Sequence, residues 1–286
     1  MHLRRLTIIG VGLIGGSLAR ALRAANCCDE IIGCGRQLPN LKTAVELGVI
    51  DRYSTDIAEA VTGADMIVVA VPLNAMASTF AAMAPQLSDD AVITDVGSAK
   101  GSVLQDAKKY LGRHYTRFVA GHPIAGTEKS GVAASFAELF INRRVILTPT
   151  TETDSQAHQQ VQEVWQKAGA DVVDMEVTHH DEVLAATSHL PHVIAYSLVD
   201  TLATMNDRVE IFRYAAGGFR DFTRIASSDP KMWHDICLKN KQAILNVLGL
   251  FKQDLQSLTE AIETEDSERI TEIFTRAKTS RDQFVD

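Results

Sequence analysis

Residues 6–16 read Leu-Thr-Ile-Ile-Gly-Val-Gly-Leu-Ile-Gly-Gly, and this stretch decides the fold of the chain. A short apolar run leads directly into a GxGxxG pattern, and a helical pattern of apolar residues follows it. In a strand–turn–helix unit the first glycine allows the tight turn, the second lets backbone approach a pyrophosphate, and the third lets helix and strand pack closely. The helix N-terminus then offers unpaired N–H groups to the phosphates. The stretch predicts a dinucleotide site, with a purely structural glycine turn as the alternative. Its predicted cofactor contacts are Gly10, Gly12, Leu13, Ile14 and Gly15.

The residues after the second predicted strand indicate which dinucleotide binds. This strand covers residues 30–34, and Gly35-Arg36-Gln37 follows it. An acid at this point would bind the ribose hydroxyls of NAD and repel a 2′-phosphate, whereas an arginine suits that phosphate. The sequence therefore favours NADP, with NAD possible. Alternatively, Arg36 is a solvated loop residue or stacks on the adenine.

Strands and helices continue to alternate up to residue 177. The βα alternation predicts a mainly parallel, doubly wound Rossmann-type sheet over residues 1–177. Val71 and Pro72, at the end of one apolar strand, are expected beside the cofactor. Two late strands are expected to close the same sheet, with a helix over 155–168 and Gly169 after its end between them. The further predicted strands are 65–71, 91–96, 144–148 and 171–174.

From residue 178 onward the pattern is helical, which predicts an all-helical second domain over 178–286. One helix is expected to begin with a capping box at Thr178 and to be disturbed at Pro191, and another begins at Asp229-Pro230. A last helix is expected over about 267–284. A narrow apolar stripe with steps of four and three suits a partner helix, which makes a homodimer the expected use, although a groove within the chain would give the same pattern. The stripe consists of Ile244, Leu248, Phe251, Leu255, Leu258 and Ile262.

The best candidate for chemistry is His122, in Gly-His-Pro-Ile-Ala-Gly-Thr-Glu at 121–128. It follows an apolar run, 117–120, that reads as a buried strand, so it is expected at the carboxyl edge where open α/β sheets bind ligands. An imidazole titrates near neutrality and can accept a hydroxyl proton as hydride leaves the same carbon. A structural histidine is the alternative. Ser98 also follows a strand end and could bind the substrate hydroxyl and the nicotinamide, or else cap the next helix.

Candidates for substrate binding lie in the helical part. Arg224 could bind a substrate carboxylate with its planar guanidinium; Arg220 is the competing choice, and an ion pair with a nearby acid is the alternative. His189 and His192 share a helical face, but no third metal ligand is nearby, so a substrate contact is predicted and no metal. His179 and His180 are expected to face solvent in a first helical turn.

Composition excludes several classes of function. The chain has 286 residues, 46% of them hydrophobic and 22% charged, and acidic residues exceed basic ones by 36 − 28 = 8. The acidic balance argues against nucleic acids and membrane surfaces as partners. The four cysteines contain no CxxC pair, and no signal segment or membrane span is apparent, so a cytoplasmic protein is expected.

Together, these motifs resemble the prephenate/arogenate dehydrogenase family of tyrosine biosynthesis. The resemblance implies oxidative decarboxylation, in which hydride passes from a cyclohexadienol ring to the nicotinamide and loss of a carboxylate aromatises the product. It implies that His122 accepts the proton of the ring hydroxyl, that Ser98 orients this hydroxyl and the cofactor, and that Arg224 binds a carboxylate. The motifs that carry the resemblance are Gly10-x-Gly12-x-x-Gly15 and the segments 95–98, 121–128, 188–192 and 218–224.

The resemblance also extends the substrate pocket. It implies that His192 and Glu128 line the pocket and that Trp233 closes it. A relaxed cyclohexadienyl specificity or a preference for prephenate over arogenate is expected. Two other functions remain open at this point: a 3-hydroxyacid dehydrogenase of the related two-domain class, and a non-catalytic NADP-binding sensor.

Overall fold

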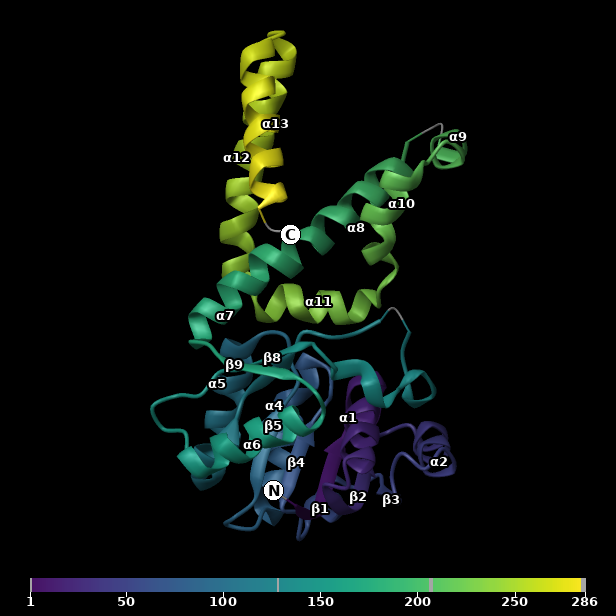
Figure 1. The fold of residues 1–286 in the computed structure, drawn as a ribbon, viewed down its shortest axis with the longest axis vertical. Coiled ribbons are helices and arrows are strands. Elements are labelled where there is room, and N and C mark those ends of the chain that lie inside the picture. The colour runs from purple at the N-terminus through teal and green to yellow at the C-terminus, as the bar shows by residue number, and fades with distance from the viewer. Residues whose placement is uncertain (1, 128, 206–207, 284–286) are drawn as a thin grey trace. The chain divides into compact units, whose positions relative to one another are not determined.

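The computed structural model describes residues 2–127, 129–205 and 208–283. The chain divides into two compact units, residues 1–241 and 242–286. The first unit contains every strand of the described residues together with helices α1 to α11, and the second consists of two long helices (Figure 1). The strand-bearing part followed by a helical part confirms the predicted fold class. The exact domain boundary at residue 177 stays a prediction.

A six-stranded parallel sheet forms the centre of the first unit. Its strand order is β3-β2-β1-β4-β5-β6, and every neighbouring pair is parallel. This is the order of a doubly wound dinucleotide-binding sheet. The strands are β1 Leu3–Ile9, β2 Cys28–Cys34, β3 Arg52–Ser54, β4 Met66–Val69, β5 Val92–Asp95 and β6 Phe118–Val119. The helices that connect them are α1 Leu13–Ala24, α2 Leu38–Glu46, α3 Ile57–Val61, α4 Met76–Met83 and α5 Lys100–Tyr110.

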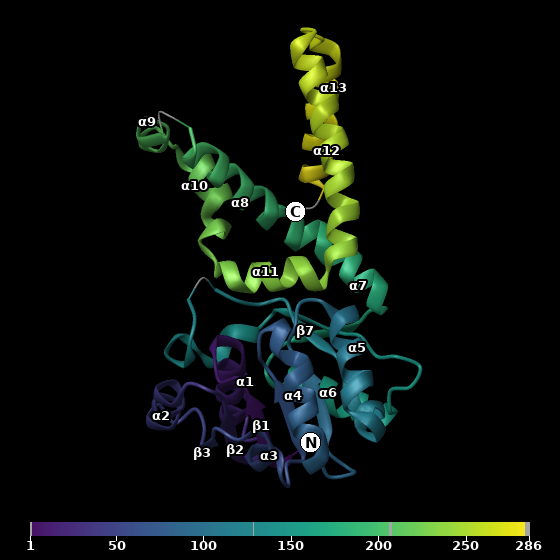
Figure 2. The same cartoon turned by 180° about the vertical axis from the view of Figure 1, so that it is seen from behind.

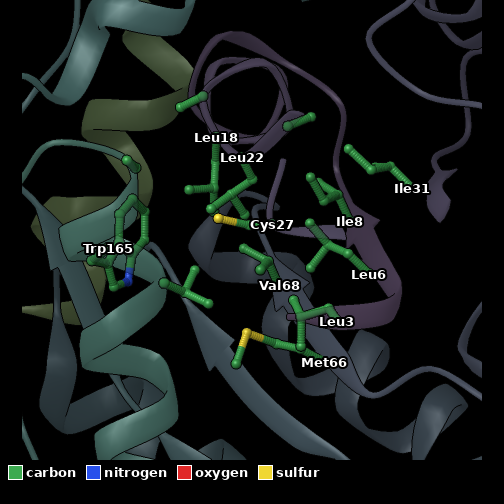
Figure 3. Packing of buried hydrophobic residues seen from close by; sticks show 14 of the residues in the cluster. Leu3, Leu6, Ile8, Leu18, Leu22, Cys27, Ile31, Met66, Val68 and Trp165 are labelled. Atoms are coloured by element: carbon green, nitrogen blue, oxygen red, sulfur yellow. The ribbon is translucent and has the colours of Figure 1, made fainter. Parts of the chain in front are cut away.

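One hydrophobic core lies between the sheet and helices α1 and α6 (Ser155–Lys167). Leu18 and Leu22 of α1 and Trp165 of α6 pack there with strand residues (Figure 3). The prediction for α6 is confirmed: it ends at Lys167, and Gly169 follows with a φ of +90°. Because that conformation strains any residue with a Cβ, glycine suits the position after the helix.

A second sheet of three strands was not predicted. It consists of β7 Gly121–Pro123, β8 Arg144–Leu147 and β9 Asp171–Asp174, with β7 antiparallel to β8 and β8 parallel to β9. The prediction that 144–148 and 171–174 close the large sheet was therefore wrong. An apolar run indicates a strand but not its partner. Only Ala120 separates β6 from β7, so the chain passes from one sheet to the other at this residue.

The helical continuation begins with α7 Val177–Leu184, which runs through a π-helical turn, Ala185–His189, into α8 Leu190–Ala203. The side chain of Glu176 caps α7 by accepting from the N–H of His179, so the capping box predicted at Thr178 was wrong by two residues. The predicted disturbance at Pro191 is a π-turn directly before it, a common response to an interrupted hydrogen-bond ladder. Asp229 caps α11 Pro230–Lys239, as predicted. Between α8 and α11 lie α9 Arg208–Arg213, α10 Gly217–Thr223 and a 3₁₀ turn, Arg224–Ser227.

The second unit is an antiparallel pair formed by α12 (Lys241–Glu263) and α13 (Ser267–Asp282) (Figure 2). Asp266 caps α13 by accepting from the N–H of Arg269. Two residues of the predicted apolar stripe stay open to solvent, because Leu255 is 51% and Ile262 is 58% exposed. Within the described ranges, none of the helices is both long and apolar enough to cross a membrane.

Candidate active site

The glycine-rich loop fits a dinucleotide. Gly10 has a φ of +100°, and a Cβ there would lie 2.2 Å from the carbonyl oxygen of Ala70. A Cβ on Gly15 would lie 2.4 Å from the oxygen of Gly10. A Cβ on Gly12, by contrast, would have no atom within 4 Å. The fold thus requires the first and third glycines, while the second faces open space at the N-terminus of α1, where a pyrophosphate would bind.

The other predicted cofactor residues surround this loop. Leu13 and Ile14 pack partly against the core, and Ile14 also lines a large cavity. Arg36 is exposed, two residues after the end of β2. Val71 is half-buried and Pro72 exposed, directly after Ala70, whose carbonyl oxygen lies against Gly10. Their contact with a cofactor remains a prediction.

Asn40, at the start of α2, holds the loop in place. Its amide donates to the carbonyl oxygen of Val11 at 2.7 Å and accepts from the N–H of Val132 at 3.2 Å. No sequence motif marks this asparagine, since both partners lie far from it along the chain.

A cavity of about 640 Å³ lies beside this loop, between the sheet edge and the helical continuation. The nucleotide-binding part contributes Ser98 and His122, and the helical part contributes His189, His192, Arg224 and Trp233. The structure therefore brings together six residues that were predicted for catalysis or substrate binding, and Ile14, a predicted cofactor contact, lines the same cavity. Arg220 lies on α10, outside the residues that line the cavity, and Glu128 lies outside the described residues.

His122 stands on β7, one residue beyond the step from β6. Its Nδ1 lies 2.9 Å from Nε2 of His180, and Nδ1 of His180 lies 2.8 Å from Oδ1 of Asp181. Burial lowers the pKa of His122 well below its usual value, and the neighbouring His180, Lys100 and His189 lower it further. The ring is thus neutral at physiological pH, with one nitrogen bonded to His180 and Nε2 left for the cavity.

The prediction that His180 faces solvent was wrong. Its side chain is fully buried, whereas His179 is exposed as predicted. His180 and Leu184 are four residues apart and share the buried face of α7. This spacing could have predicted that His180 is buried together with Leu184. Its exposure was instead inferred from its place in a first helical turn.

The aspartate behind His180 also caps a helix. Asp181 accepts from the N–H groups of Lys100 at 2.8 Å and Gly101 at 2.9 Å, the first two residues of α5. A Cβ on Gly101 would lie only 3.0 Å from Oδ2 of Asp181, so the glycine permits this approach. The alternative role of Ser98 as an N-cap is thereby corrected, because the cap comes from a residue about 80 positions later.

A buried ion pair fixes the backbone just before His122. Nζ of Lys100 lies 2.6 Å from Oδ2 of Asp95, and both side chains have no solvent exposure. Lys100 also donates to the carbonyl oxygen of Gly121 at 2.6 Å, and Oδ1 of Asp95 accepts from the N–H of Gly121 at 3.1 Å. Both polar groups of Gly121 are therefore held, which positions His122. Sequence reasoning did not select this pair.

Two further histidines face the same cavity. The ring of His192 stacks on Trp233 with centroids 3.7 Å apart, and its Nδ1 donates to the carbonyl oxygen of Ser188 at 2.8 Å. Burial lowers the pKa of His189 to about 4, and its Nδ1 lies 3.1 Å from the side-chain nitrogen of Asn240. An amide nitrogen only donates, so neutral His189 carries its proton on Nε2, a buried atom with no partner in the described residues. This leaves a neutral donor at the cavity wall.

Arg224 begins the 3₁₀ turn that borders the cavity, and its side chain is exposed. The turn is held at its end, because the hydroxyl of Tyr196 on α8 donates to the carbonyl oxygen of Ser228 at 2.5 Å. The site therefore combines a neutral imidazole, a hydroxyl and a guanidinium with a loop that fits a dinucleotide. This arrangement can bind an anion and accept a proton beside a hydride acceptor.

Comparisons with known proteins agree with this chemistry. The family model described as prephenate dehydrogenase, nucleotide-binding domain, matches residues 18–174, and the model described as prephenate dehydrogenase, dimerization domain, matches residues 176–276. The chain is 42% identical to a cyclohexadienyl dehydrogenase of Zymomonas mobilis, covering 97% of this chain and 95% of that protein. It is 39% identical to a prephenate dehydrogenase of Bacillus subtilis, covering 97% and 75%.

A solved structure shows the same likeness in three dimensions. Prephenate dehydrogenase from Aquifex aeolicus, in complex with hydroxyphenyl propionate and NAD+, matches with a TM-score of 0.92 at 39% identity over 99% of both chains. The resemblance inferred from the motifs is confirmed. The chain is an oxidoreductase with a nicotinamide cofactor, and it belongs to the prephenate dehydrogenase family.

Proposed function

We propose that the chain catalyses the oxidative decarboxylation of prephenate to 4-hydroxyphenylpyruvate and accepts arogenate as a second substrate. The observation that carries this proposal is the cavity that His122, Ser98 and Arg224 line together. Burial keeps the His122 ring neutral there by lowering its pKa. The likeness to a cyclohexadienyl dehydrogenase supports the relaxed specificity.

Each group has one task in this proposal. His122 accepts the proton of the ring hydroxyl at Nε2, and Ser98 donates to the same hydroxyl to orient it. Arg224 binds a carboxylate of the substrate, for which a planar guanidinium is well shaped. The nicotinamide cofactor supplies the hydride acceptor when it is bound.

The remaining predicted residues shape the pocket. Trp233 and His192 form a stacked wall, and the buried Nε2–H of His189 is available to a polar atom of the substrate or the cofactor. Glu128 stays a candidate pocket residue.

Few catalytic groups suffice because the product is aromatic. Once hydride has left, loss of the ring carboxylate restores aromaticity and is strongly downhill. The protein therefore needs mainly to position the reactants and accept one proton, which matches the small set of polar groups in the cavity.

We also propose that NADP is favoured over NAD. An exposed Arg36 stands just beyond the end of β2, and no acid occupies residues 35–37. A guanidinium there can bind a 2′-phosphate, and the missing carboxylate removes the usual ribose contact of NAD. The Aquifex aeolicus relative binds NAD+, so the two cofactors must be compared directly.

A homodimer formed through the second unit is the proposed assembly. Leu255, Ile262 and Phe274 are each more than half exposed on α12 and α13. The family model that covers most of these helices is described as a dimerization domain. Burying such side chains against a second copy would remove apolar surface from water.

The two other functions are less well supported. A simple 3-hydroxyacid dehydrogenase would need a base in the helical part, whereas the base proposed here, His122, lies on β7 before that part begins. A non-catalytic sensor would have no use for a base, a hydroxyl and a guanidinium in one cavity. The comparisons favour neither.

The test is a matrix of prephenate and arogenate against NADP and NAD, followed by nicotinamide absorbance. We expect prephenate-dependent reduction, faster with NADP. Turnover of a simple 3-hydroxy acid but not of prephenate would overturn the proposal.

A further inference from the structure

We propose that His180 and Asp181 form a relay behind His122, which fixes its tautomer and takes up positive charge when it accepts the substrate's proton. The inference rests on the proposed role of His122 and adds two positioning residues to it. His180 and Asp181 touch neither substrate nor cofactor in this scheme; they act through His122.

The protonation state of Asp181 determines which nitrogen of His180 carries a proton. Its carboxylate accepts from the N–H groups of Lys100 and Gly101 and from Nδ1 of His180. Hydrogen bonds of this kind favour the ionised carboxylate, and they hold the pKa of Asp181 below its usual value although burial acts against them. An ionised carboxylate has no proton to donate, so Nδ1 of His180 must carry the proton between them.

The protonation of His180 in turn determines which nitrogen of His122 carries a proton. A neutral His180 with a proton on Nδ1 has only a lone pair on Nε2. Nε2 lies 2.9 Å from Nδ1 of His122, so the proton of that bond sits on His122. Neutral His122 then has an unprotonated Nε2, which is the form that acts as a base toward the cavity.

When His122 accepts the substrate's proton, the positive charge can move on to His180. The O–H bond of the substrate breaks, its electron pair stays on oxygen, and the proton bonds to Nε2 of His122. The Nδ1 proton of His122 can then pass to Nε2 of His180, while Nδ1–H of His180 stays bonded to Asp181. The positive charge thus moves to a ring 2.8 Å from a carboxylate. The protons return along the same bonds when the phenolic oxygen of the product is protonated.

The surroundings explain why such a relay is useful. His122 is flanked by Lys100, His189 and His180, all of which oppose a positive charge on its ring. Burial lowers the pKa of His180 as well, and Lys100 also opposes a charge there, but Asp181 and Asp95 favour its protonated form, a support that His122 lacks. Charge is therefore better accommodated one ring further from the cavity.

The first experiment uses His180→Gln, with His179→Gln as the matched control. His179 is the exposed neighbour, so its replacement tests the cost of losing a histidine in this turn. We expect His180→Gln to lower kcat about tenfold to a hundredfold, a part of the usual contribution of general-base catalysis. KM for prephenate and Kd for the cofactor should stay within about twofold of wild type, and His179→Gln should match wild type. An unchanged kcat in His180→Gln, or an equal loss in cofactor binding, would overturn the relay.

Asp181→Asn provides a second variant that keeps the shape but removes the charge. It should also lower kcat at nearly constant KM, and an unchanged kcat would count against the relay.

The decisive measurement uses the wild-type protein without substrate, so it does not depend on whether a variant folds. Imidazole ¹⁵N NMR of the wild-type protein at pH 8 should show His122 and His180 both protonated on Nδ1. A proton on Nε2 of His122 would refute the relay, whereas failure to turn over prephenate would refute only the proposed function.

Discussion

Alanine substitutions at the three glycines of the nucleotide loop should have different effects. At Gly10 and Gly15 they should lower stability, and at Gly12 the substitution should weaken cofactor binding. Gly10→Ala adds a Cβ 2.2 Å from a backbone oxygen at a φ of +100°. The strained backbone costs about 1–2 kcal/mol and the overlap about 1–3 kcal/mol, so the free energy of unfolding should fall by roughly 2–5 kcal/mol. Gly15→Ala has the overlap without the positive φ, and its loss should be about 1–3 kcal/mol.

Gly12→Ala should leave stability almost unchanged, because no atom lies within 4 Å of the added Cβ and φ is −102°. Reduced freedom of the unfolded chain makes a change within about 1 kcal/mol the expected result. The same methyl group occupies the space through which the pyrophosphate approaches, so Kd for the cofactor should rise at least about tenfold, or about 1.4 kcal/mol.

Urea unfolding measures the stability of the three variants, and quenching of tryptophan fluorescence measures their cofactor binding. Trp233 lines the cavity and can report on occupancy. We expect Gly12→Ala to keep its stability but bind the cofactor poorly, and Gly10→Ala and Gly15→Ala to be less stable than wild type. This expectation would be wrong if Gly12→Ala bound NADP as tightly as wild type, or if it lost as much stability as Gly10→Ala.

Four further outcomes follow from the site. Arg224→Ala should raise KM for prephenate at least about tenfold with a smaller effect on kcat, consistent with loss of a charged hydrogen bond; an unchanged KM would remove Arg224 from the pocket. Arg36→Ala should weaken NADP and spare NAD in equilibrium titrations, and equal effects would show that it does not contact the 2′-phosphate. Because burial lowers the pKa of His122, the acidic limb of kcat/KM should lie below pH 6.5, and a midpoint above that value would contradict the assignment. The pKa of His189 is about 4 in the folded chain, so the unfolded chain binds a proton that the folded chain excludes, and stability should fall as the pH drops from about 6.5 toward 4 in urea titrations; a flat profile would contradict its burial.

The sequence was sufficient for features that depend on local pattern. The glycine loop, the alternating strands and helices, the end of α6 at Gly169 and the cap at Asp229 each follow from residues close together along the chain. The large sheet and the helical continuation could therefore be predicted. The partner of a strand is not a local property, which is why β8 and β9 were assigned to the wrong sheet.

The same limit applies to the site. His122, Ser98 and Arg224 could be selected because each stands in a distinctive local motif, and all three line one cavity. His180 and Asp181 act through partners that lie some 60 to 80 residues away along the chain, at His122 and at the start of α5. Nothing in their immediate sequence indicates those contacts, and they became visible only when the fold brought the segments together.

The central claim is that His122 accepts the hydroxyl proton of a cyclohexadienol while hydride leaves the same ring. The most direct measurement compares the purified protein with His122→Asn in prephenate-dependent reduction of NADP, with cofactor Kd measured on both. The account predicts a loss in kcat of about a hundredfold to ten-thousandfold with Kd unchanged. Turnover by His122→Asn at the wild-type rate would contradict it.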